Sequence, residues 1–231
     1  MSHITLTGFM GSGKSVVGQE VARRLGRTFV DMDAVIEERA AKSIPRIFAE
    51  DGEPAFRQME AALCVELSAQ DGLVIATGGG ALINPANRAV MMRSGVVICL
   101  AATPEEILRR VGGDASRPLL QVPDPRARIA ELLAARRAAY AAIPWQVDTT
   151  GLSVEEVAAR VIAVAGYETL TVHYPGGEYP IHVGVGALQH SGGALRATGA
   201  PDGSRVAVVS NPTVAPLYGC LLYTSPSPRD S

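Results

Sequence analysis

The sequence predicts an α/β fold, with a five-stranded parallel sheet flanked by helices and followed by an incomplete β-rich segment. Three observations support this prediction. Short apolar runs alternate with amphipathic helical stretches from Ile4 to about Ala165, the rhythm of parallel strands joined by helical crossovers. A glycine-rich turn separates the first apolar run from the first helical stretch. After Gly166 the helical periodicity fades, and glycine and proline turns separate β-rich runs.

The strands expected in the first segment are short and mostly apolar, as strands covered on both faces should be. They are residues 3–7, 28–31, 73–77, 96–101 and 145–148. Helices are expected between them, at 14–25, which Gly26 should end, and at 54–69. Two further helices should begin with capping boxes, formed by Thr103 with Glu106 and by Ser153 with Glu156.

One stretch breaks this alternation. Residues 112–125 contain two glycines and three prolines around Arg117. Such composition is typical of a mobile surface loop, and loops of this kind often serve as lids.

Composition excludes several classes of function. The formal net charge of −2 provides no positive field of the kind that attracts nucleic acid or anionic lipid, so neither is an expected partner. No apolar run is long enough to cross a bilayer. The sequence begins with an alternating strand pattern and not with the charged and then apolar segments of a signal peptide, so a cytoplasmic protein is expected. The three cysteines lack CxxC spacing and should be reduced.

The glycine-rich turn at residues 8–15 matches the phosphate-binding pattern G-x-x-x-x-G-K-S. It follows a predicted strand and opens a predicted helix, which is the context that such a loop requires. Its backbone N–H groups and the helix N-terminus would hold the phosphates of ATP, Lys14 would add a charge at the β- and γ-phosphates, and Ser15 would bind Mg²⁺. Lys14 is one of only two lysines in the chain, which argues against a simple turn. The expected phosphate-binding residues are Gly11, Ser12, Gly13, Lys14, Ser15 and Val16.

A phosphate loop alone fits GTPases, motor ATPases and several kinds of kinase. The sequence has no N-K-x-D guanine motif and no long apolar strand ending in Asp-Glu. A compact small-molecule kinase is therefore favoured. In an open parallel sheet its acceptor would bind at the carboxyl ends of the strands beside the phosphate loop.

Three features fall at those strand ends. The pair Asp31 and Asp33 could serve Mg²⁺ and an acceptor hydroxyl, or Asp33 could simply cap a helix at 34–40. The run 78–80 is three glycines, which allow close approach to a ligand or form a flexible turn. Arg57 and Glu60 lie three residues apart on a predicted helix, where an ordinary surface ion pair is the alternative.

Together these motifs resemble shikimate kinases over about residues 1–165. The matching features, in the order and spacing of the family, are the phosphate loop, Asp31-x-Asp33, Phe56-Arg57-x-x-Glu60, Gly78-Gly79-Gly80, Arg117-Pro118-Leu119-Leu120, and Arg136 four residues before Tyr140. The resemblance implies ATP-dependent phosphorylation of the 3-hydroxyl of shikimate, in the biosynthesis of chorismate and aromatic amino acids. It also implies Mg²⁺ as cofactor and a monomeric kinase domain.

The resemblance implies a role for each matching residue. Arg57 and Arg136 would hold the carboxylate of shikimate, with Glu60 fixing Arg57, and Asp33 would orient or deprotonate the attacking hydroxyl. The glycines Gly78, Gly79 and Gly80 would border the ring of shikimate. Asp31 would hold Mg²⁺ through water, beside Ser15. Lys14 and Arg117 would contact the transferring phosphoryl group, and Arg110 would lie against the adenine.

The segment 166–219 resembles the first strands of dehydroquinate synthases, through residues 179–184 and 208–218. That family uses NAD and a divalent metal, whose binding residues would lie beyond the end of this chain, so this segment is expected to be an inactive remnant of a bifunctional fusion. Residues 220–231 resemble neither part and are expected to be a disordered or artefactual tail.

Two alternatives to shikimate kinase stay open. One is another metabolite kinase, such as a gluconate-type enzyme, with the same phosphate loop and a different acceptor pocket; an acceptor without a carboxylate would not need two arginines. A catalytically silent nucleotide-binding module would bind ATP without acceptor-dependent turnover.

Overall fold

The computed structural model describes residues 2–111, 122, 124–166, 168–174 and 177–183. Three predictions from the sequence lie outside these residues. They are the lid loop around Arg117, the motif at 208–218, and the tail 220–231.

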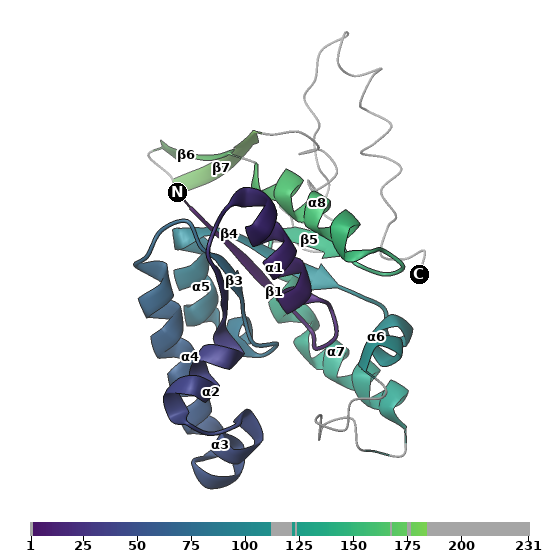
Figure 1. The fold of residues 1–231 in the computed structure, drawn as a ribbon. Coiled ribbons are helices and arrows are strands. Elements are labelled where there is room, and N and C mark those ends of the chain that lie inside the picture. Colours follow the sequence, from purple (N-terminus) through teal and green to yellow (C-terminus); the bar gives the residue numbers. More distant parts are fainter. Residues whose placement is uncertain (1, 112–121, 123, 167, 175–176, 184–231) are drawn as a thin grey trace.

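The centre of the fold is a five-stranded, all-parallel sheet with the strand order β2-β3-β1-β4-β5 (Figure 1). Each of the five predicted strands is present, with bounds that differ from the predicted ones by at most one residue at either end. They are β1 (His3–Gly8), β2 (Phe29–Asp31), β3 (Val74–Ala76), β4 (Gly95–Ala101) and β5 (Trp145–Asp148). The predicted α/β fold class is therefore confirmed.

Helices cover both faces of the sheet (Figure 1). The two with predicted bounds are α1 (Lys14–Leu25), as expected, and α4 (Gly52–Ser68), which begins two residues earlier than predicted. The others are α2 (Met32–Ala40), α3 (Ile44–Glu50), the 3₁₀ turn η1 (Ala81–Ile83), α5 (Pro85–Ser94), α6 (Pro104–Val111), α7 (Pro125–Ala141) and α8 (Val154–Ala165).

Alternate side chains of the sheet belong to two separate cores, because successive residues of a strand face opposite sides. In β4, Ile98 and Leu100 pack with α1 and α8, whereas Val97 and Cys99 pack with α2, α3, α4 and α5. The runs of buried residues in β1 and β3 have the same cause. The sheet is thus a rigid platform, and the loops at its carboxyl edge are held between the two cores.

Two details of helix starts differ from the prediction. Asp31, and not Asp33, caps the helix: α2 begins at Met32, and an oxygen of Asp31 accepts the N–H of Asp33. At α6, the Thr103 hydroxyl accepts the N–H of Glu106, but the Thr103 N–H donates to Thr150. The Thr103 capping box is therefore only half formed, whereas the one between Ser153 and Glu156 is complete.

After α8, strands β6 (Glu168–Tyr174) and β7 (Gly177–Val183) form an antiparallel pair. This pairing agrees with the β-rich character predicted after Gly166.

In the described part of the chain, no helix combines the length and the apolar character that crossing a membrane requires.

Candidate active site

A cavity of about 590 Å³ opens along the carboxyl edge of the sheet. One end is lined by Asp31, Asp33 and Gly79, the middle by the loop between β1 and α1, and the other end by α6 and the start of α8. The strand order turns back at β1, since β3 lies on one side of it and β4 on the other. Such a switch point is where open parallel sheets bind their ligands.

The loop between β1 and α1 has the backbone of a phosphate-binding loop. Gly8 has φ +135°, and a β-carbon there would lie 2.2 Å from the carbonyl oxygen of Leu100. Gly13 has φ +93° and directly precedes α1, so only glycine fits the sharp entry into the helix. The loop therefore brings the N-terminus of a twelve-residue helix to the cavity.

Lys14 lies across this loop. Its ammonium nitrogen donates to the carbonyl oxygens of Gly8, at 3.1 Å, and Phe9, at 2.9 Å. The side chain lines the cavity, so the loop itself holds the positive charge beside the helix N-terminus.

Ser15 and Asp31 form an oxygen-rich corner. The Ser15 hydroxyl donates to Asp31 Oδ2 over 2.6 Å, and Asp31 Oδ1 is occupied by the cap of α2. Mg²⁺ prefers oxygen ligands and keeps several waters, so a hydroxyl and one carboxylate beside a phosphate loop fit its chemistry. The described residues contain no group of three or more His, Cys, Asp or Glu side chains that could hold a metal ion. A Mg²⁺ site completed by phosphates and water does not need such a group.

Asp33 and Glu60 meet at Gly78, although they belong to different helices. A β-carbon on Gly78 would lie 2.5 Å from Asp33 Oδ1 and 3.0 Å from Glu60 Oε1. Glu60 is only 1% exposed. Burial raises the pKa of Glu60, and the nearby Asp33 adds to this effect, while Arg57 opposes it. This corner therefore concentrates acidic groups beside the glycine run.

Arg57 projects from α4 toward the third glycine. Its Nη1 donates to Glu60 Oε2 over 2.7 Å, and its other nitrogens donate to Glu53. A β-carbon on Gly80 would lie 2.6 Å from Nη1 of Arg57. The predicted pairing with Glu60 is present, and because Glu60 is buried this is not an ordinary surface ion pair.

Arg136, on α7, approaches the same glycine run. Its Nη1 donates to the carbonyl oxygen of Gly79 over 3.3 Å, and the hydroxyl of Tyr140 donates to the same oxygen over 2.8 Å. The guanidinium carbon of Arg136 lies 5.3 Å from the centre of the Phe9 ring in the phosphate loop. The glycine run thus lies between two guanidinium groups, one contacting Gly80 and one contacting Gly79.

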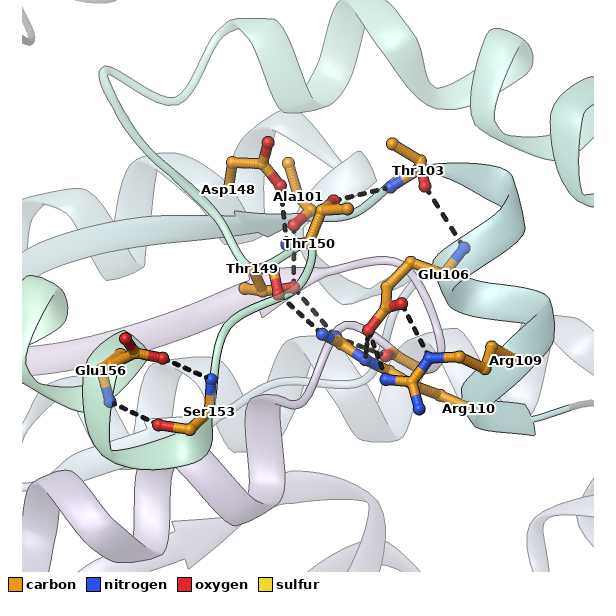
Figure 2. A network of polar contacts seen from close by, with 11 residues as sticks. Ala101, Thr103, Glu106, Arg109, Arg110, Asp148, Thr149, Thr150, Ser153 and Glu156 are labelled. Carbon is orange, nitrogen blue, oxygen red and sulfur yellow. Dashed lines mark hydrogen bonds and ion pairs between the residues drawn. The ribbon is translucent and has the colours of Figure 1, made fainter.

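Arg110 lines the opposite end of the cavity. Figure 2 shows it within a network of polar contacts with Glu106 and Thr149. Its guanidinium donates to the Glu106 carboxylate, to the carbonyl oxygen of Gly11, and to both oxygens of Thr149. Hydrogen bonds from Arg109, together with the charge of Arg110, lower the pKa of Glu106 to about 2. Arg110 therefore ties together the phosphate loop, α6 and the loop before α8.

Several cavity residues were not predicted from the sequence. They are Met10, Val17, Thr77, Arg109, Val111, Thr149, Leu152, Ser153, Val154 and Val157. The capping box at Ser153 predicted where α8 begins, but no spacing in the sequence shows that this start faces the phosphate loop. The one available signal was that Thr149 follows the last predicted strand, and so must lie at the carboxyl edge of the sheet.

The predicted site residues fall into two groups. Those that line the cavity are Gly11, Ser12, Gly13, Lys14, Ser15, Val16, Asp31, Asp33, Gly79 and Arg110. Arg57, Gly78, Gly80 and Arg136 are not part of that lining, but contacts through the glycine run and Asp33 connect them to it. Arg117 lies outside the described residues.

Comparison with known proteins decides the family. The shikimate kinase family matches residues 10–165 of this chain. The chain belongs to the shikimate kinase family. It is therefore a kinase with a nucleotide-binding phosphate loop, as the sequence predicted.

Several shikimate kinases illustrate the similarity. The enzyme of Geobacter metallireducens is 45% identical over 159 residues, which cover 69% of this chain and 89% of the relative. That of Halorhodospira halophila is 48% identical over 162 residues, covering 70% of this chain and 92% of the relative. Among solved structures, shikimate kinase from Acinetobacter baumannii in complex with shikimate has a TM-score of 0.67 and 36% identity, covering 71% of this chain and 92% of that one.

Proposed function

We propose that this kinase transfers the γ-phosphoryl group of ATP to the 3-hydroxyl of shikimate. The observation that carries the proposal is the position of two guanidinium groups, Arg57 at Gly80 and Arg136 at Gly79, next to a phosphate loop. Shikimate is a small carboxylate with three hydroxyls, and two guanidinium groups match the need of a carboxylate for fixed, charge-assisted hydrogen bonds.

In the proposed reaction, Asp33 accepts a hydrogen bond from the attacking hydroxyl and takes its proton as the new bond forms. The hydroxyl oxygen attacks the γ-phosphorus, the bond from the γ-phosphorus to the bridging oxygen breaks, and ADP leaves. Phosphoryl transfer depends mainly on positioning and on charge neutralisation, with little covalent help from the protein.

Three cationic groups are proposed to act on the nucleotide. Lys14 contacts the β- and γ-phosphates together with the loop amides of residues 11–16, and Arg117 closes over the transferring group. Arg110 lies against the adenine, supported by its hydrogen bonds to Glu106 and Thr149. Ser15 and, through water, Asp31 hold Mg²⁺, which would neutralise phosphate charge when bound.

We further propose that the kinase domain spans residues 1–165 and is monomeric. Residues 166–219 would be an inactive remnant of a dehydroquinate synthase-like domain, and residues 220–231 would belong to neither part. Light scattering measures the molar mass of the purified chain and so tests whether it is monomeric.

ADP release by the purified chain with Mg-ATP tests the proposed acceptor. Shikimate should stimulate turnover strongly, whereas gluconate, quinate and the absence of an acceptor should leave only a low background. Strong stimulation by gluconate, or none by any acceptor while ATP still binds, would contradict the proposal.

Replacing Arg57 tests the carboxylate contact. Arg57→Ala should raise the KM for shikimate about 10- to 100-fold, since a charged hydrogen-bonding partner contributes about 1.5–3 kcal/mol. The KM for ATP should change little. Arg39→Ala is the matched control, because Arg39 also joins a glutamate of α4, Glu66, but on the exposed surface. Equal effects of the two variants on shikimate would count against the assigned contact.

A further inference from the structure

Tyr140 has no role in the reaction as described so far, yet its hydroxyl makes a well-formed contact in the acceptor region. The hydroxyl donates to the carbonyl oxygen of Gly79 over 2.8 Å, while Arg136 donates to the same oxygen over a longer 3.3 Å. Its ring packs against two hydrophobic cores, one that contains Cys99 and one that contains Phe9. Tyr140 therefore joins a rigid core to the middle of the glycine run.

Burial keeps this phenol a hydrogen-bond donor. Desolvation raises the pKa of Tyr140 above its usual value, an effect that the charge of Arg136 and its hydrogen bond to the phenol only partly offset. The phenol stays neutral near neutral pH and retains its proton for the Gly79 carbonyl. The contact persists over the whole range in which the enzyme would be assayed.

The hydrogen bond fixes more than one atom of the glycine run. The described residues contain no cis peptide bond, so in the planar peptide between Gly79 and Gly80 the C=O and the N–H point in opposite directions. Holding the C=O toward α7 makes the N–H of Gly80 point away from α7. Main-chain hydrogen bonds from Ala81 to Gly78 and from Ile83 to Gly80 already span the run. Since three consecutive glycines have unusual conformational freedom, the anchor from Tyr140 further restricts this peptide to one orientation.

Arg136 is shared between the protein and, under the proposed function, the acceptor. While Arg136 donates to the Gly79 carbonyl, that N–H cannot donate to a carboxylate. If Arg136 were the only donor to this partly buried oxygen, turning the guanidinium toward the acceptor would leave the oxygen without a hydrogen bond, which is costly. The second and shorter hydrogen bond from Tyr140 removes that cost. Phe9 provides the guanidinium with a flat surface on which it can turn.

We propose that Tyr140 is a positioning residue: it holds the Gly79 carbonyl so that Arg136 is released to bind the carboxylate of the acceptor. The proposal rests on the function proposed above. It predicts an effect on acceptor binding that acts through Arg136, with little effect on ATP or on turnover at saturation.

The test is Tyr140→Phe, which keeps the ring in the cores and removes only the hydroxyl. The KM for shikimate should rise about 3- to 10-fold, as expected for one neutral hydrogen bond, while kcat and the KM for ATP stay near the wild-type values. In an Arg136→Lys background the same change should have a clearly smaller effect, because the group that it releases is already altered.

Gln146→Met is the matched control. Gln146 donates to the main-chain oxygens of Tyr140 and Ile143 at the end of α7, so this variant loosens the same helix end without touching the phenol. It should leave the KM for shikimate near the wild-type value. An equal rise in both variants, or the full Tyr140→Phe effect in the Arg136→Lys background, would overturn the proposal in favour of a general packing role.

Hydrogen–deuterium exchange provides a second test that needs no acceptor. In the chain without ligand, a peptide covering residues 77–83 should exchange faster in Tyr140→Phe than in the wild type or in Gln146→Met; equal exchange in all three would refute the anchoring. If wild-type turnover is not stimulated by shikimate, the proposed function fails, and this experiment still decides whether Tyr140 fixes the glycine run.

Discussion

Lys14 lines the described cavity, and its proposed role places its charge at the phosphoryl group that is transferred. Replacing it by Met should lower kcat about 100- to 1,000-fold, because a charge positioned at the transferring group acts mainly in the transition state. The measurement is ADP release at saturating ATP and shikimate, with circular dichroism to show that the variant is folded. Lys42→Met, which removes the other lysine and its contacts to Glu50 and Asp51, should keep kcat close to that of the wild type.

His3 links folding stability to pH. It is 1% exposed, and its Nδ1 accepts the N–H of Leu73 over 3.1 Å. Burial lowers the pKa of His3 below the usual 6.5, so the unfolded chain binds a proton more readily than the folded one. The contribution of His3 to stability is therefore fully present above pH 6.5 and is lost as the pH falls through the folded-state pKa.

Urea unfolding between pH 7.5 and 5.5 measures this effect. The wild type should lose stability toward the acid end, whereas His3→Asn, which can accept a hydrogen bond but does not titrate, should lose less. Parallel curves for the two proteins would show that another group causes the acid loss.

At the residue scale, the sequence identified side chains within motifs and missed those that act through the fold. The places of Lys14 and Ser15 in the cavity were predictable because both belong to the phosphate-loop motif, and that of Asp31 because it ends a predicted strand. Thr149 was not, since its partner Arg110 is 39 residues away in the sequence. The capping box at Thr103 was overestimated because Arg109 and Arg110 compete for the Glu106 carboxylate.

At the scale of elements, the end of α2 carries backbone strain. Ala41 has φ +48°, and no other non-glycine residue in the described ranges has a positive φ. Ala41→Gly should raise the free energy of unfolding by about 0.5–1 kcal/mol, since glycine adopts this conformation without a steric penalty. Chemical denaturation measures the change.

The control for this prediction is Ala69→Gly at the end of α4. Ala69 has φ −87°, so glycine relieves nothing there and only adds freedom to the unfolded chain. This variant should be slightly less stable than the wild type. If both glycine variants shift stability in the same direction, strain at Ala41 is not the cause.

Strands were easier to predict than helices, for a physical reason. A strand buried on both faces is mostly apolar, as in β4 and β3, and such runs are visible in the sequence. In contrast, α3 is only seven residues long, with only Ile47 fully buried, so it has almost no apolar period. The helix α3 depends on packing against α4, where the rings of Phe48 and Phe56 contact each other in a tilted arrangement.

At the scale of the whole molecule, α8 is part of the core of the proposed kinase domain. Val157, Ala158, Val161 and Val164 of α8 pack against the sheet and α1. A chain that ends after Gly166 should therefore fold and phosphorylate shikimate at a rate close to that of the full chain. Steady-state assays and thermal unfolding of both proteins measure this.

A second, shorter variant tests where the kinase domain ends. A chain that ends after Gly151 lacks α8 and exposes the apolar face that α8 covers, so it should fail to fold. Loss of activity in the variant ending at Gly166 would show that the later residues contribute to the kinase.

The bridge from Gly11 through Arg110 to Thr149 also has a consequence for synthesis on the ribosome. The phosphate loop is translated well before the oxygens of Thr149 that hold Arg110, and well before α8, the helix that covers α1. A nascent chain thus displays the loop long before the opposite wall of the nucleotide cavity exists. Because a ligand stabilises only the state that binds it, ATP should favour the finished domain and give no advantage to its incomplete precursors.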